Sequence, residues 1–175
     1  MFDVDLVRQD FPGTHGQVYL NSASIGLPAK SATDAVKRVA TLLGQGPANM
    51  GYKAYYEELG RPGSQAREEV AKLLNARKEE VALIDDTTMG LNLALSAIPF
   101  SPGDNVVLCD LEYPQVAISA AHPQHNQTVE VRVVSHHGGV VTIEDFKKLI
   151  DHKTRAIIVS AVQWINGLRM DLAAF

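Results

Sequence analysis

One stretch near the middle of the chain, residues 81–98, constrains the fold more than any other. It opens with the apolar run Val81-Ala-Leu-Ile84 and continues with four small polar residues, Asp85-Asp-Thr-Thr88. Apolar residues at helical spacing follow, namely Leu91, Ala94, Leu95 and Ile98. The pattern predicts a strand, a tight turn and the N-terminus of a helix, which is the repeating unit of α/β folds.

The predicted turn offers hydrogen-bond donors to an anion. The first N–H groups of a helix have no partner inside it, and the helix dipole is positive at that end. The hydroxyls of Thr87 and Thr88 add two donors, so the junction suits a phosphate group. An ordinary β–α junction is the alternative, because Asp and Thr are common N-cap residues. The nucleotide fingerprints GxGxxG and GxxxxGK[ST] are both absent.

Composition and charge argue against several classes of protein. The 175 residues are 46% hydrophobic and 21% charged, which is typical of a globular domain with its own core. A formal net charge of −4 argues against nucleic acid as a partner. The N-terminal segment lacks the apolar core of a signal peptide, and no run is long enough to span a membrane. We therefore expect a cytoplasmic protein without membrane contact.

Neither the cysteine nor the histidines form a reactive or metal-binding pattern. Cys109, the single cysteine, lies in an apolar run without a basic neighbour, so we expect a buried strand residue and not a reactive thiol. The pairs His122/His125 and His136/His137 have no acidic or cysteine partners at ligand spacing. We expect no metal site.

Helix and strand signals alternate along the rest of the chain. An irregular arm is expected over residues 1–18, followed by a loop of small residues at 21–28. Further helices are expected at 28–43, 52–59, 64–74, 115–121 and 142–151, with a break at Arg61-Pro-Gly63. Strands are expected at 81–84, 105–109, 129–134 and 155–162, the last buried on both faces. The alternation predicts an α/β fold with a mostly parallel sheet.

Three polar loops follow predicted strands, at residues 85–88, 110–115 and 163–167. In an open α/β sheet the carboxyl ends of the strands are where ligands bind. The sequence therefore predicts one ligand site built from these loops, with a phosphate at residues 87–88.

Short motifs distributed along the chain carry a resemblance to a known family. In order they are Phe11-Pro12, Tyr19-Leu-Asn21, Ala66-Arg67, Val70-Ala-Lys-Leu-Leu74, Glu80-Val81, Thr87-Thr88-x-x-x-Asn92, Gly103-Asp-Asn-Val106, Glu112-Tyr113 and Val159-Ser-x-Val162-x-x-x-x-Gly167. Each is short and degenerate, but their order and spacing resemble the N-terminal part of class V aminotransferases. These are pyridoxal phosphate (PLP) enzymes and include cysteine desulfurases and proteins similar to isopenicillin N epimerase.

The resemblance implies a fold and a division of the chain. The fold is the three-layer α/β/α arrangement around a mostly parallel sheet, part of the large PLP-binding domain of the aspartate aminotransferase-like fold. Residues 1–27 would form an N-terminal arm and a substrate-side loop. Residues 28–175 would form an incomplete large domain. The family also implies a homodimer and an amino acid as the substrate.

Site residues follow by position from the same resemblance. Thr87, Thr88 and Met89 would hold the PLP phosphate, and Tyr113 would stack on the pyridine ring. Gln163 would donate to the ring hydroxyl of PLP. The substrate would lie near Asn21 and Ser24, in the loop of small residues.

The chain departs from the desulfurase pattern at three positions. Desulfurases carry histidine where Tyr113 stands, glutamate is common where Met89 stands, and asparagine is usual where Trp164 stands. Because tyrosine titrates near pH 10, Tyr113 is expected to stack without transferring protons at neutral pH. These departures favour an epimerase-like or general aminotransferase branch.

The family's covalent chemistry needs two more residues. A lysine forms a Schiff base with PLP and an aspartate pairs with the pyridinium nitrogen, and in this family both lie downstream of the strand that ends near Val162. We therefore expect the 175 residues to form part of a larger enzyme and to be inactive alone, with no catalytic residue in this segment. A phosphate-binding or regulatory α/β domain without PLP catalysis is the alternative function.

Overall fold

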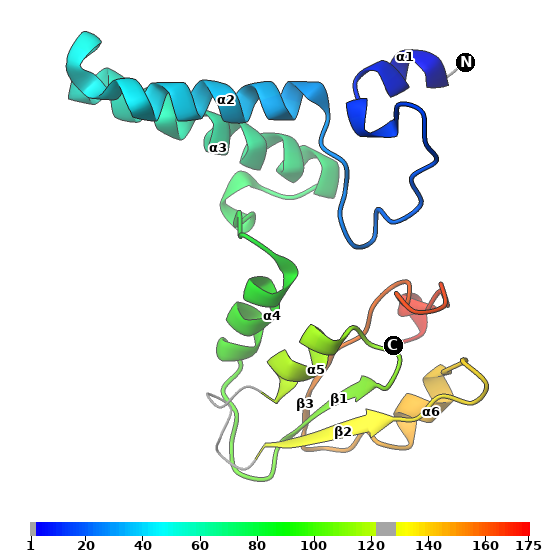
Figure 1. The fold of residues 1–175 in the computed structure, drawn as a ribbon. Coiled ribbons are helices and arrows are strands. Elements are labelled where there is room, and N and C mark those ends of the chain that lie inside the picture. The colour runs from blue at the N-terminus through cyan, green and yellow to red at the C-terminus, as the bar shows by residue number, and fades with distance from the viewer. Residues whose placement is uncertain (1–2, 122–128) are drawn as a thin grey trace. The chain divides into compact units, whose positions relative to one another are not determined.

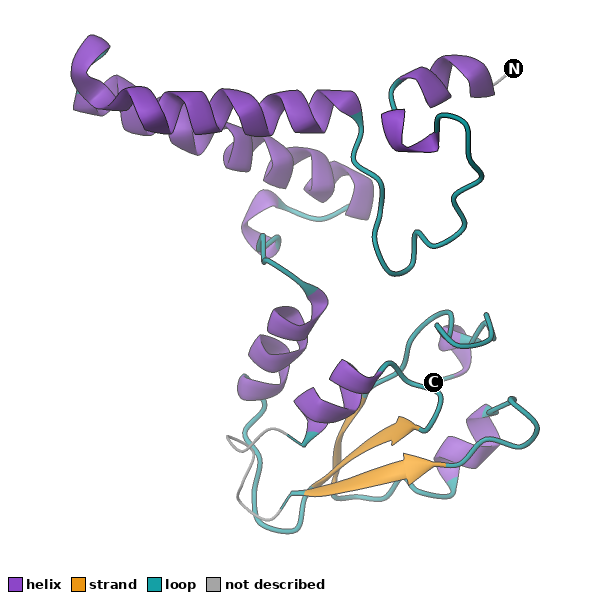
Figure 2. Ribbon diagram, viewed as in Figure 1, coloured by secondary structure: helices purple, strands orange, loops and turns teal. Residues whose placement is uncertain are grey.

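The structure is a computed structural model that describes residues 3–121 and 129–175. It divides into two compact units, Met1–Leu83 and Ile84–Phe175. Within the first unit the elements are α1 (Val4–Gln9), η1 (Pro12–Thr14), α2 (Lys30–Gln45), η2 (Gly46–Asn49), α3 (Tyr52–Leu74) and η3 (Lys78–Glu80) (Figure 1). Those of the second unit are α4 (Thr87–Ser96), β1 (Asn105–Cys109), α5 (Pro114–Ala120), β2 (Glu130–Val134), α6 (Ile143–Lys147), β3 (Thr154–Ile157) and η5 (Leu172–Ala174). All three strands therefore lie in the second unit (Figure 2).

The N-terminal arm is more regular than its glycines and prolines predict. Residues 4–9 form α1, because the carboxylate of Asp3 accepts hydrogen bonds from the N–H groups of Asp5 and Leu6 at 3.1 Å each. This N-cap satisfies two donors that a helix start otherwise leaves free. The expectation of an irregular arm over residues 1–18 is wrong for this stretch.

Helix α3 runs through the predicted break at Pro62 without interruption. Proline removes one N–H and disfavours a helix interior, which is why two helices were expected on either side of it. The parts of α3 before and after Pro62 are held by an ion pair within the helix and by hydrogen bonds to residues beyond it. Arg61 pairs with Glu58 across the proline's own turn, and Arg67 donates to the carbonyls of Val81 and Lys78 at 2.9 and 3.1 Å.

The predicted strand at residues 81–84 does not form in the described part of the chain. A strand needs a neighbour to pair with its backbone, and the three paired strands are β1, β2 and β3. Val81 is buried, whereas Leu83 and Ile84 are largely exposed. The helix that follows forms as expected, and α4 begins at Thr87.

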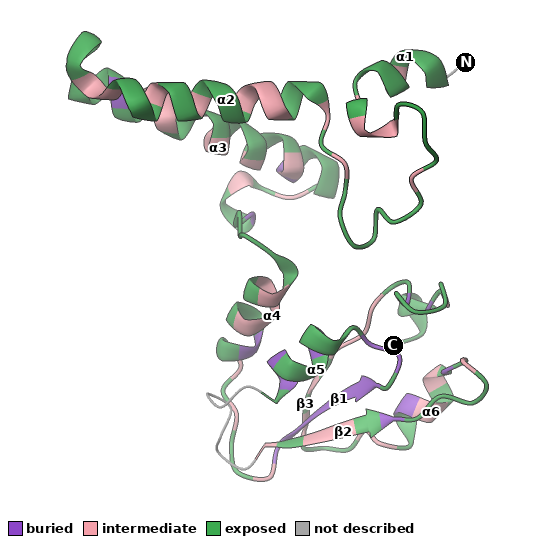
Figure 3. Ribbon diagram, viewed as in Figure 1, coloured by how far each residue is buried: buried purple, intermediate pink, exposed green. Residues whose placement is uncertain are grey.

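The sheet is parallel, with strand order β2-β1-β3. Central strand β1 is buried along its whole length (Figure 3). Phe146 of α6 packs with Val107 and Cys109 on one face, and Val116 of α5 packs with Val106 and Leu108 on the other. The second unit is therefore an α/β/α arrangement, which confirms the predicted α/β fold and parallel sheet.

Two elements are shorter than predicted. β3 ends at Ile157 and its side chains alternate between half-buried and exposed, because it lies at an edge of the three-stranded sheet. The expectation of a strand to residue 162 buried on both faces is therefore wrong. α6 starts with a capping box of Thr142 and Asp145 but stops at Lys147. A turn replaces its last residues, in which the N–H of Leu149 donates to the carbonyl of Phe146 at 2.9 Å.

Candidate functional site

The N-terminus of α4 keeps hydrogen-bond donors free. The first helical bond joins the N–H of Gly90 to the carbonyl of Asp86 at 3.2 Å, and the Asp86 carboxylate accepts from the N–H of Met89 at 2.7 Å. The N–H groups and hydroxyls of Thr87 and Thr88 have no partner among the described residues. Two backbone donors and two hydroxyls are thus available at the positive end of the helix, as the sequence predicts.

Gly90 lets the Ile84 side chain lie close against the first turn of α4. A Cβ atom built at Gly90 would stand 2.6 Å from Cδ1 of Ile84, which is closer than real contacts of this kind. Because Cδ1 is the end of a flexible and partly exposed side chain, a larger residue at position 90 would require that side chain to turn away. Sequence reasoning missed this constraint, although a glycine one turn into a predicted helix was the signal for it.

The loops after β1 and β3 come together through an aromatic pair. The rings of Tyr113 and Trp164 pack edge to face, with centroids 5.3 Å apart and planes at 89°. Both side chains remain about half exposed, at 49% and 52%. Tyr113 is also the N-cap residue of α5, and Pro114 occupies the first turn. Two of the three predicted ligand loops therefore meet at this pair.

Gln163 lies beneath this surface and already uses its donor. Its side chain is 1% exposed, and its Nε2 donates to Oε1 of Glu112 at 2.9 Å and to Sγ of Cys109 at 3.6 Å. Its Oε1 is buried without a partner among the described residues. The predicted donation from Gln163 to a ring hydroxyl stays a prediction, and it competes with the bond to Glu112.

Glu112 is the residue of this region that sequence reasoning did not select. Its carboxylate is buried, and it accepts from both the N–H and the hydroxyl of Ser160 at 2.7 and 2.6 Å. A carboxylate directly after a fully apolar strand was the available signal, since buried acids need partners.

Cys109 is buried in β1, as predicted. Burial raises the pKa of its thiol, and the nearby carboxylates of Glu112 and Asp110 raise it further. The thiol is therefore protonated at neutral pH and acts as an apolar core residue.

The predicted substrate residues lie in the first unit. The loop that carries them closes on the Tyr19 hydroxyl, which donates to the carbonyls of Asn21 and Ile25 at 3.2 and 2.7 Å. Asn21 and Ser24 are both exposed, and the Ser24 N–H donates to the Asn21 carbonyl at 3.1 Å. Their approach to a substrate stays a prediction.

No group of metal-binding side chains occurs within residues 3–121 and 129–175. His136 and His137 lie in a turn before α6, where the His136 N–H donates to Asp110 at 3.0 Å. His122 and His125 lie outside the described residues. In the described part of the chain no helix is both long and apolar enough to cross a membrane.

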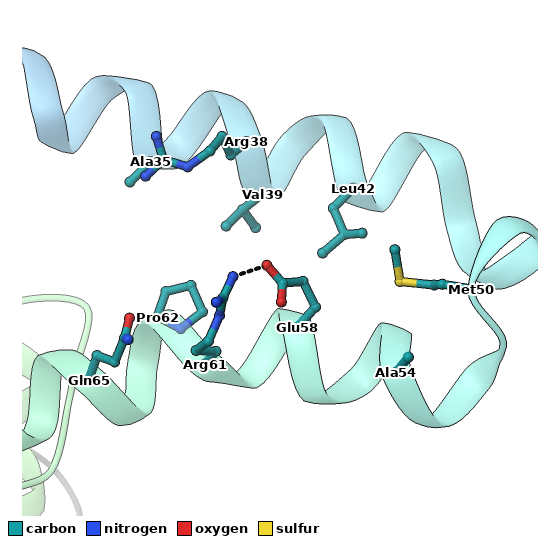
Figure 4. Close-up of a pocket in the computed structure, with 10 residues that line it drawn as sticks. All are labelled: Ala35, Arg38, Val39, Leu42, Met50, Ala54, Glu58, Arg61, Pro62 and Gln65. Carbon is teal, nitrogen blue, oxygen red and sulfur yellow. Dashed lines mark hydrogen bonds and ion pairs between the residues drawn. The ribbon is translucent and has the colours of Figure 1, made fainter.

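The cavity at α2 and α3 is separate from the residues above. It measures about 620 Å³, and both helices contribute to its lining, for example Val39 and Leu42 from α2 and Pro62 from α3 (Figure 4). Arg61 and Glu58 form their ion pair at its wall. None of the predicted site residues lines it.

Comparison with known proteins decides the family. The model of the aminotransferase class-V family matches residues 18–175, which is most of the chain. The chain belongs to the aminotransferase class-V family. The resemblance seen in the sequence is thereby confirmed.

Relatives of this class-V chain include both enzymes and uncharacterised proteins. An uncharacterised protein of Schizosaccharomyces pombe is 36% identical over 110 residues, covering 62% of this chain and 25% of the relative. A probable cysteine desulfurase of Methanothermobacter thermautotrophicus is 28% identical over 169 residues, covering 95% of this chain and 41% of the relative. The class-V chain thus spans between a quarter and two-fifths of the length of these two relatives.

Solved structures share the fold. A mutant of C-DES with glycine covalently linked to its PLP cofactor superposes with a TM-score of 0.83 at 21% identity, covering 95% of this chain and 43% of that one. The cysteine desulfurase CsdA of Escherichia coli superposes with a TM-score of 0.75 at 21% identity, covering 99% and 45%. This likeness confirms the predicted fold class.

Proposed function

We propose that this class-V chain is the N-terminal segment of a PLP-dependent enzyme that acts on an amino acid, with the cofactor phosphate at Thr87 and Thr88. The observation that supports this proposal most directly is at the N-terminus of α4. There both residues keep an N–H and a hydroxyl without a partner in the described chain. Four donors at a helix N-terminus match the oxygens of a phosphate. Met89 has no free backbone donor, because the Asp86 carboxylate accepts a hydrogen bond from its N–H, so its contact with the cofactor stays a prediction.

The residues present fit the cofactor at two points. The free donors of α4 are one, and the half-exposed ring of Tyr113 is the other, since an aromatic ring can stack on the pyridine. PLP, when bound, supplies the electron sink for chemistry at the α-carbon of an amino acid. The chain's own contribution is to bind the phosphate and to orient the ring.

None of the eight lysines suits covalent attachment of the cofactor. Seven pair with carboxylates of the described chain: Lys30, Lys37, Lys53, Lys72, Lys78, Lys147 and Lys148. The eighth, Lys153, lies in the turn before β3, at the opposite end of that strand from the ligand loops. An attacking lysine must be desolvated, whereas most of these lysine side chains are exposed to solvent. We therefore propose that the 175 residues have no PLP-dependent turnover alone.

The finer parts of the proposal rest on family resemblance. We place the enzyme nearer the epimerase-like and general aminotransferase members than the desulfurases, because Tyr113 and Trp164 replace the usual histidine and asparagine. We also propose a cytoplasmic homodimer with an amino acid substrate approaching Asn21 and Ser24. The absence of any buried residue within 3–28 supports an arm that packs on another surface.

A phosphate-binding or regulatory domain without PLP chemistry is not favoured, because the family match extends over residues 18–175.

Substitution of the second threonine tests the proposed phosphate site. In the full-length protein, Thr88→Val removes the hydroxyl but keeps the shape, the branching at Cβ and the backbone N–H. We expect PLP to bind about 1.5–3 kcal/mol more weakly, the usual range for one hydrogen bond to a charged group. The PLP dissociation constant is measured by fluorescence titration, and Thr41→Val in α2 is the control because its hydroxyl bonds only to the Lys37 carbonyl. An unchanged dissociation constant in Thr88→Val removes this residue from the site.

A further inference from the structure

The carboxylate of Glu112 joins the ends of two neighbouring parallel strands. It lies three residues after β1 and accepts three strong hydrogen bonds from the segment that follows β3. The donors are the N–H of Ser160 at 2.7 Å, the hydroxyl of Ser160 at 2.6 Å and Nε2 of Gln163 at 2.9 Å. We call the three side chains of Glu112, Ser160 and Gln163 the carboxylate clasp.

The clasp fixes which way the Gln163 amide faces. Both oxygens of Glu112 accept hydrogen bonds from the segment after β3, and the NH₂ group of Gln163 is turned toward Glu112 as one of the donors. Its carbonyl oxygen then points the other way and is buried without a partner in the described chain. The donor of Gln163 is therefore held inside the protein, whereas the next residue along the chain, Trp164, is exposed.

Two of the three clasp residues each directly precede one of the aromatic residues. Tyr113 follows Glu112 and Trp164 follows Gln163. Because successive residues share a peptide bond, the 2.9 Å contact between the polar side chains limits where the two aromatic rings lie. The rings stand edge to face at 5.3 Å on the exposed side of the same two loops.

We propose that Glu112 is a positioning residue for the aromatic pair, and that it acts through Gln163 and Ser160 to present Tyr113 to the cofactor ring. In this arrangement Gln163 belongs to the clasp and makes no contact with the ring hydroxyl of PLP. The proposal rests on the proposed function in one respect, namely that Tyr113 faces PLP. The clasp itself is independent of the cofactor.

Gln163→Glu is the sharpest test, because it places a second carboxylate at hydrogen-bond distance from Glu112. Like charges this close favour uptake of one proton, which rebuilds the contact at low pH only. In the full-length protein we expect PLP to bind about tenfold more weakly than in wild type at pH 8, equivalent to 1.4 kcal/mol. The difference in PLP affinity between the variant and wild type should be smaller at pH 5.5. The titratable groups beside Glu112 include Cys109 and Asp110, and Cys109 stays protonated over this range because burial raises its pKa.

Alkylation of Cys109 provides a readout that needs no cofactor. Gln163 and Glu112 both contact the Cys109 thiol, so opening the clasp should expose it. We expect Gln163→Glu to raise the rate of maleimide addition to Cys109, mapped by mass spectrometry, above that of wild type at pH 8. Because the reaction of any thiol slows as pH falls, each rate is compared with wild type at the same pH, and this ratio should return toward one at pH 5.5. Ser160→Ala, which removes one bond without adding charge, should give a smaller rise at both pH values. Glu144→Gln in α6 is the matched control for an exposed carboxylate.

The outcomes separate this proposal from the proposed function. Increased labelling of Cys109 with pH-dependent loss of PLP affinity supports the positioning role. Unchanged labelling and affinity in Gln163→Glu overturn it, as does a loss of affinity that is the same at both pH values. If wild type itself does not bind PLP, the proposed function is overturned, and the labelling alone decides whether the clasp exists.

Discussion

The two compact units bury their apolar side chains to very different extents (Figure 3). In the second unit the apolar faces of α5 and α6 cover both sides of β1, and Val107 and Phe146 are completely buried. In the described part of the first unit α2 has no buried residue at all, although with 16 residues it is longer than either α5 or α6. Its Val36 and Leu43 are mostly exposed, as are Leu73 and Leu74 at the end of α3.

The difference shows what each unit depends on for its structure. A parallel strand is hydrogen-bonded and covered only by residues distant in sequence, so the second unit carries its own stabilising core. The long helices of the first unit satisfy their backbone internally and are supported along their surface by ion pairs such as Lys37–Asp34 and Lys72–Glu69. Such exposed pairs contribute little free energy each, so this unit is expected to be the less stable one.

The largest expected effect comes from truncating a core side chain. Phe146→Ala should lower the free energy of unfolding of the second unit by about 3–5 kcal/mol, the usual cost of deleting a buried phenylalanine. Leu43→Ala in α2 is the matched truncation, and it should change stability by less than about 0.5 kcal/mol because Leu43 is 56% exposed. Urea unfolding followed by circular dichroism measures both. A large loss in Leu43→Ala would mean that α2 is covered by another surface in solution.

An intermediate effect is expected from restoring the missing donor of α3. Pro62→Ala supplies an N–H that can bond to the Glu58 carbonyl one turn earlier, and it should stabilise the helix by about 1–3 kcal/mol. Hydrogen exchange of residues 52–74 should slow, while exchange in β1 should not change. If exchange in α3 becomes faster, the packing of the proline ring at the cavity wall outweighs the lost hydrogen bond.

The smallest effect concerns acid stability in the two units. Arg132 lowers the pKa of Asp151 in the second unit, and Lys78 lowers the pKa of Glu68 in the first. A carboxylate with a lowered folded-state pKa stabilises above its unfolded value of about 4, and this contribution is lost as pH falls below that value. The stability deficits of Asp151→Asn and Glu68→Gln should therefore be present at pH 7 and shrink by pH 2.5, as measured by urea unfolding. Deficits that are equal at both pH values would contradict the ion-pair explanation.

Some features follow from local sequence and were predictable for that reason. The strand at 105–109 is a short apolar run between a turn and a polar loop, and the capping box at Thr142 involves residues only three apart. The donors at Thr87 and Thr88 follow from the start of any helix at that position. Even the family could be identified from the order of short motifs, because order along the chain is a property of the sequence itself.

Other features depend on residues that are distant in sequence. The continuity of α3 through Pro62 relies in part on Arg67 reaching Val81, and the segment 81–84 is no strand because no described strand lies beside it. Glu112 and Gln163 are 51 residues apart, and nothing near either one indicates that its partner is the other. The sequence by itself determined the α/β class, the family and the free donors at Thr87 and Thr88, since each follows from periodicity or from motifs along the chain. Tertiary structure alone decided which polar groups are buried together, because a buried hydrogen bond depends on how the chain brings distant side chains within 3 Å of each other.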